Sequence, residues 1–136
     1  LGEPHFKKLQ AVLAEALFSI NAVKGFEYGE GFKAASMYGS QCNDIFVRDE
    51  NAWIKTETNH SGGIQGGISN GEKIYFNVAF KPIPTIMQTQ KTVNKEGEEV
   101  IYNIEGRHDV CVVPRVLPIV EAMTAIAIMD MELYRF

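Results

Sequence analysis

The chain has 136 residues, of which 46% are hydrophobic and 22% charged, and its formal net charge is -4. This length is enough for one domain with a proper core, and the composition is ordinary for a globular protein. The negative charge argues against non-specific binding to nucleic acid or to a membrane surface, because both require a basic face.

The first half of the chain predicts a helix, a strand and a loop-rich segment. Apolar side chains recur at helical spacing over residues 4–18, so we expect an amphipathic helix there. Residues 23–28 alternate weakly in the manner of a strand. Residues 38–58 are mixed and polar, and they predict a loop with short strands near 45–47 and 53–55.

The second half predicts a strong strand, a hairpin and a long helix. Residues 74–80 are β-branched and aromatic, which favours a strand. Residues 91–94 and 99–104 predict the arms of a hairpin around a charged turn. Residues 114–134 predict a helix that is apolar nearly all round from 116 to 129. That stretch is too short to span a bilayer, so we expect a buried core helix and an α+β fold.

A glycine-rich segment at residues 59–71 holds five of the twelve glycines of the chain. It fits neither the dinucleotide fingerprint nor the Walker pattern. Glycine lets a backbone approach another group closely, and that group is either a ligand, such as a flat ring, or a packed strand. Both interpretations remain open for this segment.

The segment Lys-Pro-Ile-Pro-Thr at residues 81–85 follows the strongest predicted strand. Its two prolines favour an extended backbone, so Lys81 and Thr85 are held at set positions. An ammonium and a hydroxyl group on a stiff backbone suit a phosphate or carbonyl oxygen. The alternative is a proline-terminated edge with a solvated lysine.

Residues 106–115 place charges of both signs just before the C-terminal helix. Such charges are costly to bury without partners, so we expect this run to face a ligand or an interface. On an extended backbone Arg107 and Asp109 share one face. They form a salt bridge, or else Arg107 faces an anion while Asp109 steers a proton or holds a cofactor nitrogen. Arg115 either binds a ligand or contacts nearby carbonyl groups, and we expect the latter.

The other reactive residue types give weaker signals. His5 and His60 lack a partner nearby in the sequence, so we interpret them as ordinary surface or loop histidines. Cys42 and Cys111 are far apart and outside any zinc-ligand spacing, which favours reduced thiols in a cytoplasmic protein and no metal site. No nucleophile elbow occurs, so covalent hydrolase chemistry is disfavoured.

In combination, these segments resemble the C-terminal part of chorismate synthase over nearly the whole chain. The matching motifs are Ser-Ile-Asn-Ala-Val-Lys-Gly-Phe-Glu at 19–27, Gly-Ser-Gln at 39–41 with Asn43-Asp44, the glycine-rich segment 59–71, Ala-Phe-Lys-Pro at 79–82, and Gly-Arg-His-Asp at 106–109 with Cys111, Pro114-Arg115, Pro118 and Glu121.

The resemblance implies an enzyme of the shikimate pathway and of aromatic amino acid biosynthesis, with helices between antiparallel sheets. The family is a carbon–oxygen lyase that eliminates phosphate and a ring proton from 5-enolpyruvylshikimate 3-phosphate, giving chorismate. It requires reduced FMN without net redox change, and it assembles as a homotetramer. The resemblance implies catalytic roles for Asp109 and Arg107. It implies flavin contacts at Asn21, Ala22, Gly66, Lys81, Pro82, Ile83, Pro84, Thr85 and Arg107, which we expect to converge on one cleft.

Family members are roughly twice this length or more, and the resemblance places their catalytic histidines in an N-terminal half that these 136 residues lack. We therefore expect an enzyme fragment, residues 1–136 being a C-terminal portion that is inactive alone. Two other functions stay open at this point. One is a flavin- or nucleotide-binding module that stands alone without catalysis. The other is a structural domain whose glycines and Arg–Asp pair serve packing only.

Overall fold

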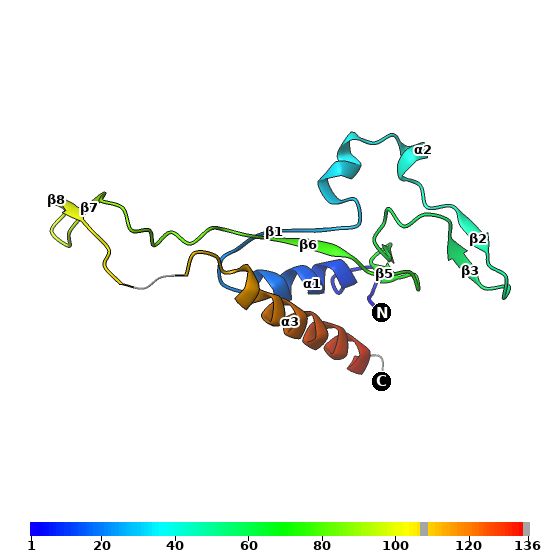
Figure 1. The fold of residues 1–136 in the computed structure, drawn as a ribbon. Coiled ribbons are helices and arrows are strands. Elements are labelled where there is room, and N and C mark those ends of the chain that lie inside the picture. The colour runs from blue at the N-terminus through cyan, green and yellow to red at the C-terminus, as the bar shows by residue number, and fades with distance from the viewer. Residues whose placement is uncertain (107–108, 135–136) are drawn as a thin grey trace.

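The computed structural model describes residues 1–106 and 109–134, and it has helices packed on small antiparallel sheets (Figure 1). The α+β fold class predicted from the sequence is therefore confirmed. In chain order the elements are α1 (Leu9–Phe18), β1 (Val23–Tyr28), the 3-10 helix η1 (Gly31–Ser36), α2 (Gly39–Cys42), β2 (Phe46–Arg48), β3 (Ile54–Thr56), β4 (Ile64–Gln65), β5 (Ile68–Ser69), β6 (Phe76–Phe80), β7 (Gln90–Val93), β8 (Glu99–Tyr102) and α3 (Val113–Leu133).

Helix α1 supplies the centre of the core. Leu9, Leu13 and Leu17 recur every fourth residue and are fully buried, because this spacing puts them on one face of the helix. The face packs against β1 and α3. Leu9 and Leu13 form one cluster of buried residues with Ile64, Ala127 and Met131. Burial of apolar side chains on this one stripe is what holds the two helices and the strand together.

The predicted helix at 4–18 begins later than expected, at Leu9. Phe6 has a φ of 53° and is almost fully exposed, so the chain cannot be helical there. The backbone N–H of Leu9 instead donates to the carbonyl of Gly67, 2.8 Å away. This bond ties the start of α1 to the glycine-rich segment and fixes where the helix begins.

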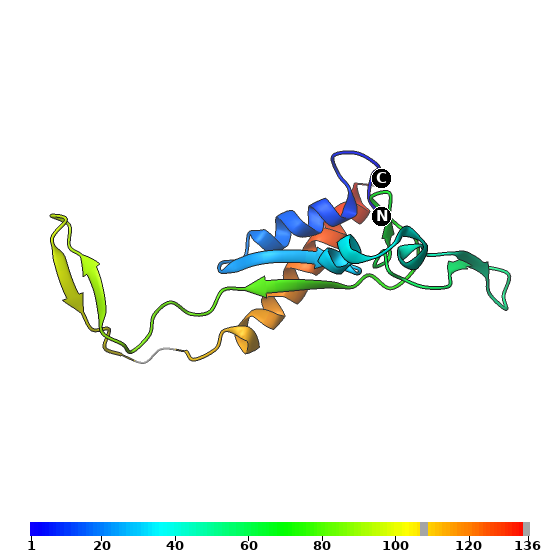
Figure 2. The same cartoon turned by 90° about the horizontal axis from the view of Figure 1, so that it is seen from above.

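Strands β1 and β6 form an antiparallel ribbon in which Val23 faces Phe80 and Tyr28 faces Phe76. Both predicted strands are confirmed, although β6 begins two residues later than the pattern suggested. Helices α1 and α3 lie on the same side of this ribbon (Figures 1 and 2). The short strands expected in the loop-rich segment are also present, as the β2–β3 hairpin.

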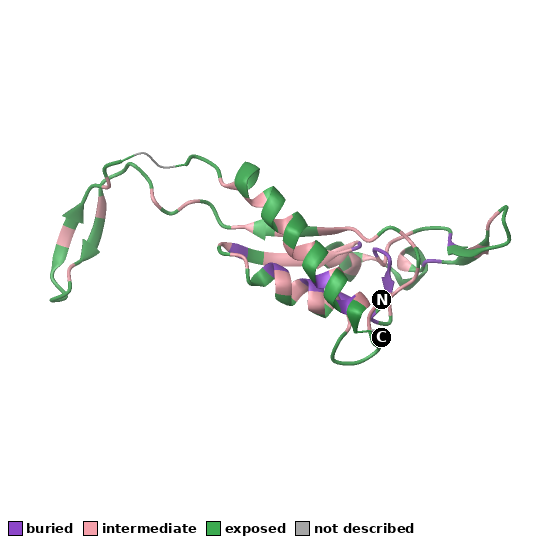
Figure 3. Cartoon of the chain, turned by 90° about the horizontal axis from the view of Figure 1, so that it is seen from below, coloured by how far each residue is buried: buried purple, intermediate pink, exposed green. Residues whose placement is uncertain are grey.

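Helix α3 has the expected position, but it is not a buried core helix in this chain. Its buried residues are Ala127 and Met131. The exposed side of α3 (Figure 3) carries large apolar residues at Ile119, Ile126, Met129 and Leu133. The prediction was wrong on this point because α1 covers only one side of the helix, and no element of the described residues covers the other.

The predicted hairpin at 91–104 is confirmed as β7 and β8, in which Gln90 pairs with Tyr102 and Val93 with Glu99. It projects away from the helices and from the β1–β6 ribbon (Figures 1 and 2). Ile101 and Tyr102 on this hairpin are largely exposed. An isolated two-stranded hairpin is marginally stable in water, so this arm depends on its own turn and cross-strand pairs.

Candidate functional site

The turn between α1 and β1 contains two of the residues expected to contact flavin. Ala22 has a φ of 72°, a conformation that side chains other than glycine seldom adopt. The carbonyl of Ala22 accepts a hydrogen bond from the backbone N–H of Lys81 at 2.8 Å. The structure therefore brings Asn21, Ala22 and Lys81 together. Strained backbone of this kind concentrates at ligand sites and tight turns.

A cavity of about 480 Å³ lies between this turn and the start of α3. Its walls are mostly apolar, with an amide and a hydroxyl side chain at one end. The lining residues are Ser19, Ile20, Asn21, Ala22, Val112, Val116, Ile119 and Met123. A concave, largely apolar space with few polar groups is the usual form of a small-molecule site.

Residues 81–85 leave β6 without forming regular structure, as the two prolines predicted. Lys81, Pro82 and Pro84 are exposed, whereas Ile83 and Thr85 are partly buried. The ammonium group of Lys81 is therefore available to an anion. The backbone of Lys81 is held by its hydrogen bond to the carbonyl of Ala22.

Asp109 lies in the segment before α3 and pairs with Arg115. Its Oδ2 is 2.7 Å from Nη1 of Arg115, and both side chains are well exposed. Arg107, the predicted partner of Asp109, lies outside the described residues, as does His108. We expected Arg115 to contact nearby carbonyl groups, whereas in the structure its guanidinium group pairs with the carboxylate of Asp109.

Gly66 lies at the opposite end of α1 from Asn21 and Ala22. It occupies the β4–β5 turn, next to Gly67, whose carbonyl binds the first residue of α1. A helix of ten residues is about 15 Å long, so α1 separates the two groups by that distance. The expectation that all the flavin-contact residues converge on one cleft is therefore not met within the described chain.

In the glycine-rich segment, one glycine allows a close packing of backbone and another leaves space for a ligand, so each of the two interpretations applies to a different residue. Gly62 has a φ of 65°, and a Cβ atom there would lie 2.4 Å from the backbone nitrogen of Gly29. That glycine serves a tight structural crossing. Gly66 has a φ of 61°, yet nothing lies within 4 Å of the corresponding Cβ position. The backbone of Gly66 is therefore open to an approaching group.

Asp44 belongs to the Asn43-Asp44 motif, and in the structure it is a polar anchor between two loop segments, a role that no sequence pattern predicted. It is buried, and its carboxylate accepts bonds from Thr58 Oγ1 at 2.7 Å and from the backbone N–H groups of His60 and Ser61 at 2.8 Å each. Burial by itself would raise the pKa of Asp44, but the hydrogen bonds from Ser61, Thr58 and His60 outweigh it and hold the pKa at about 2. Its partners are at least 14 residues away, so no local pattern reveals these contacts.

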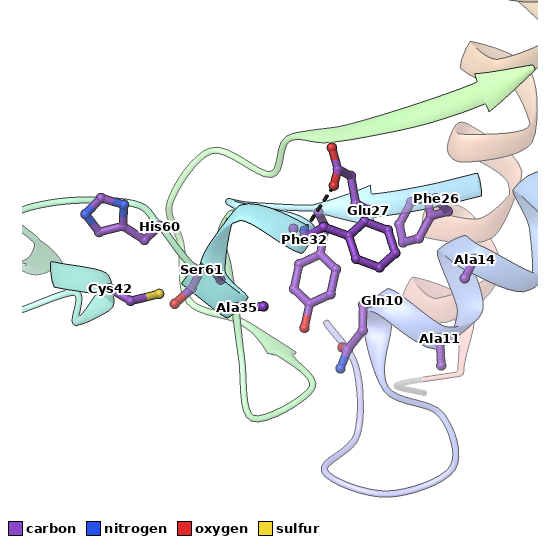
Figure 4. A pocket seen from close by; sticks show the side chains of 13 residues that line it. Gln10, Ala11, Ala14, Phe26, Glu27, Phe32, Ala35, Cys42, His60 and Ser61 are labelled. Atoms are coloured by element: carbon purple, nitrogen blue, oxygen red, sulfur yellow. Dashed lines mark hydrogen bonds between the residues drawn. The ribbon is translucent and has the colours of Figure 1, made fainter. Parts of the chain in front are cut away.

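A second cavity, of about 570 Å³, lies beside this anchor, between α1, β1 and η1. Gln10, Ala11 and Ala14 of α1 contribute one wall, and Phe32 of η1 another (Figure 4). The Oε1 atom of Gln10 is buried, and within the described residues it has no hydrogen-bond partner.

His60 lines that cavity and has a partner that is distant in the sequence. Its Nδ1 lies 3.2 Å from Oε1 of Glu30, so this loop histidine has a partner 30 residues away in the sequence. Glu30 also binds Nζ of Lys33 at 2.6 Å. The hydrogen bonds from Lys33 and then from His60 lower the pKa of Glu30.

Metal and membrane signals are lacking in the described part of the chain. No group of three or more His, Cys, Asp or Glu side chains there is arranged to hold a metal ion. Within the same residues, no helix has both the length and the apolar character needed to cross a bilayer. Cys42 and Cys111 are both free thiols.

The fold and these turns define an α+β protein whose candidate ligand site is built from backbone turns and an ion pair at a helix start. Comparison with known proteins then gives its family. The model of the chorismate synthase family matches residues 1–133. The chain therefore belongs to the chorismate synthase family.

Individual relatives agree with this assignment. The chain is 61% identical over 133 residues to chorismate synthase of Cytophaga hutchinsonii, covering 98% of this chain and 37% of that protein. It is 54% identical over 136 residues to the enzyme of Azobacteroides pseudotrichonymphae, covering 100% of this chain and 38% of the relative. A crystal structure of a chorismate synthase is similar with a TM-score of 0.57 and 39% identity, covering 60% of this chain and 25% of that one. The chain thus spans a little over a third of the length of its curated relatives.

Proposed function

We propose that this chain supplies a C-terminal portion of a chorismate synthase, residues 1–136 forming part of one larger domain. The reaction is the 1,4-elimination of phosphate from 5-enolpyruvylshikimate 3-phosphate, with loss of a ring proton, to give chorismate. The observation that carries the proposal is the family match over residues 1–133. The enzyme class, carbon–oxygen lyase, and the shikimate pathway follow from that family.

The residues of this chain fit a flavin cofactor at two places. The first is the Asn21-Ala22 turn, where a positive φ at Ala22 and an apolar cavity of about 480 Å³ suit the edge of a flat ring. The second is Gly66, whose backbone is open because nothing would meet a Cβ atom there. When bound, reduced FMN would lend an electron as phosphate leaves and regain it as the ring proton is lost, so that no net redox change results.

The side chains of this chain have binding and proton-handling roles in the proposal. Lys81 offers an exposed ammonium group, and the hydrogen bond from its backbone N–H to the carbonyl of Ala22 holds it beside the Asn21-Ala22 turn. Asp109 has an accessible carboxylate that can hold or accept a proton at the start of α3. Arg107 is assigned to the flavin and to the negative charge of the substrate.

The charges of this chain alone cannot complete such a site. The substrate carries a phosphate and two carboxylates, and FMN adds a further phosphate. The chain has four arginines and a net charge of -4, so neutralising both ligands requires further cations. We therefore propose that the 136 residues are inactive alone and act together with the remainder of a family protein.

The test is a graft of this chain into a relative. The 133 residues of this chain that align with the Cytophaga hutchinsonii enzyme at 61% identity replace their counterparts in that enzyme. With reduced FMN under anaerobic conditions, we expect the grafted enzyme to release phosphate from 5-enolpyruvylshikimate 3-phosphate within about tenfold of the parent rate. A folded graft that binds FMN but releases no phosphate contradicts the proposal.

Assembly and location complete the proposal. We infer a homotetramer in the cytoplasm, with the small-molecule substrate as partner and neither nucleic acid nor membrane involved. The negative net charge supports the exclusion of nucleic acid and of anionic membranes. Sedimentation of the grafted enzyme measures the assembly state directly, and a monomer at all concentrations contradicts the tetramer.

A further inference from the structure

The ion pair between Asp109 and Arg115 joins a loop residue to a helix residue. Arg115 lies in the first turn of α3, where its backbone N–H donates to the carbonyl of Val112 at 2.9 Å. Pro114, just before it, is at one of the first two helical positions, and proline there presets the helical backbone. The base of the Arg115 side chain is therefore fixed by regular structure.

Asp109 has no such support from the described residues that follow it, 110–112. Residues 109–112 form no helix or strand, and Val110, the next residue along, is fully exposed. Apolar packing therefore does not fix this part of the loop. Among the described residues, Arg115 is the charged side chain that pairs with the carboxylate, at 2.7 Å from Nη1 to Oδ2. Helix α3 therefore fixes the position of Arg115, and the ion pair with Arg115 in turn positions the carboxylate of Asp109.

Because the ion pair is exposed, it adds little to the stability of the fold, and its main effect is to restrict the position of the carboxylate. The side chains of Arg115 and Asp109 are 73% and 42% exposed. Ion pairs in such surroundings stabilise a fold by roughly 0 to 1 kcal/mol, because water screens them. The guanidinium group is planar and presents N–H donors in a fixed fork, so a single contact still restricts where the carboxylate lies.

We propose that Arg115 is a positioning residue, which sets the location of the Asp109 carboxylate at the start of α3. This inference rests on the proposed function, because it matters only if Asp109 acts on the flavin or the substrate. Arg115 itself need not touch either of them. A displacement of about 1 Å at a reacting group can cost a factor of about 100 in rate, so loss of the contact has a measurable effect.

The test uses the grafted enzyme. With Arg115→Ala we expect kcat to fall about 10-fold to 100-fold, with KM and the affinity for FMN changed less than about threefold. Arg115→Lys keeps a cation on the same helical turn, and we expect it to recover part of the lost kcat. Arg48→Ala removes the same charge from β2, outside the proposed site, and serves as the matched control.

A double-mutant cycle separates positioning from a direct role. If Arg115 acts through Asp109, then Arg115→Ala changes kcat less than about twofold when Asp109 is already asparagine. Equal losses in both backgrounds, or wild-type kcat in the single variant, overturn the inference. If the unsubstituted graft is inactive, the proposed function fails instead, so the two failures are distinguishable.

Discussion

At the scale of single residues, the hydrogen bonds that lower the pKa of the buried carboxylate of Asp44 come from residues distant in the sequence. Asp44 is a carboxylate between two loop segments, and three donors from residues 58–61 converge on it. That segment leads directly into the glycine-rich turn that contains Gly62 and Gly66. The position of the candidate flavin contact at Gly66 therefore depends on a buried charge 22 residues earlier in the chain.

A first prediction concerns acid stability. The folded pKa of Asp44 is about 2, below its usual value of 3.8. Because folding lowers this pKa, ionised Asp44 stabilises the folded state. This contribution to the free energy of unfolding is fully present above about pH 4 and is lost as the pH falls towards 2. That contribution is about 2 kcal/mol. We expect Asp44→Asn to lower the free energy of unfolding by about this amount at neutral pH and by much less near pH 2.

Urea unfolding at several pH values between about 7 and about 2 measures this difference. Asp130→Asn is the matched control, because Asp130 is exposed on α3 and the substitution is the same. If Asp44→Asn and Asp130→Asn have equal effects at neutral pH, the anchoring role of Asp44 is wrong.

At the scale of elements, α1 and the β4–β5 hairpin position the proposed ligand contacts. The sequence predicted α1, β1 and β6 well, because their patterns are local: leucines four residues apart, and strands rich in aromatic and β-branched residues. The pairing of β1 with β6 and the bond from Leu9 to Gly67 join segments about 50 to 60 residues apart. No local pattern encodes such contacts, so the location of Gly66 could not be predicted.

A second prediction follows from the leucine stripe of α1. Leu13 is fully buried in the main hydrophobic cluster. We expect Leu13→Ala to lower the free energy of unfolding by about 2 to 5 kcal/mol, since it leaves a cavity. Phe18→Ala, on the same helix at a residue that is half exposed, is the control and should cost less than about 2 kcal/mol. Denaturant titrations of both variants provide the comparison, and equal losses would contradict the assigned core.

A third prediction uses two glycines with nearly the same backbone conformation. Both Gly62→Ala and Gly66→Ala incur the left-handed penalty, about 1 to 2 kcal/mol. Only Gly62→Ala also forces a Cβ atom against the backbone of Gly29, so we expect it to destabilise the chain by clearly more than Gly66→Ala.

Gly66→Ala has the converse effect on the cofactor. In the grafted enzyme, we expect a methyl group at this open position to weaken FMN binding at least about tenfold while the fold persists, because it fills the space left for the ligand. Flavin fluorescence titration measures the affinity. Unchanged FMN affinity in a folded Gly66→Ala graft removes Gly66 from the cofactor site.

At the scale of the whole molecule, much apolar surface stays uncovered. Helix α3 presents Ile119, Ala122, Ile126, Met129 and Leu133 on its exposed side. These residues are spaced alternately by three and four, the repeat with which helices pack side by side. The sequence predicted that α3 is apolar all round, but it could not show that this chain alone covers only one side. The curated relatives are more than twice as long, which agrees with a site and a core that need further chain.

A fourth prediction concerns the projecting hairpin. Strands β7 and β8 pair with each other, and the turn between them is held by Asn94, which accepts bonds from the N–H groups of Glu96 and Glu98. We expect replacement of residues 90–102 by a short Gly-Ser linker to change the free energy of unfolding by less than about 1 kcal/mol. Hydrogen exchange should be faster in this hairpin than in α1, and slow exchange there contradicts its independence.

The hydrogen bonds at the two ends of α1 constrain how the chain can vary in length. Leu9 is tied to Gly67 at one end, and Ala22, just past the other, is tied to Lys81. One extra turn inserted into α1 would lengthen it by about 5 Å and pull one of these attachments apart. Insertions in the β7–β8 turn displace neither attachment. Natural length variation is therefore expected at the tip of that hairpin and excluded from the first helix.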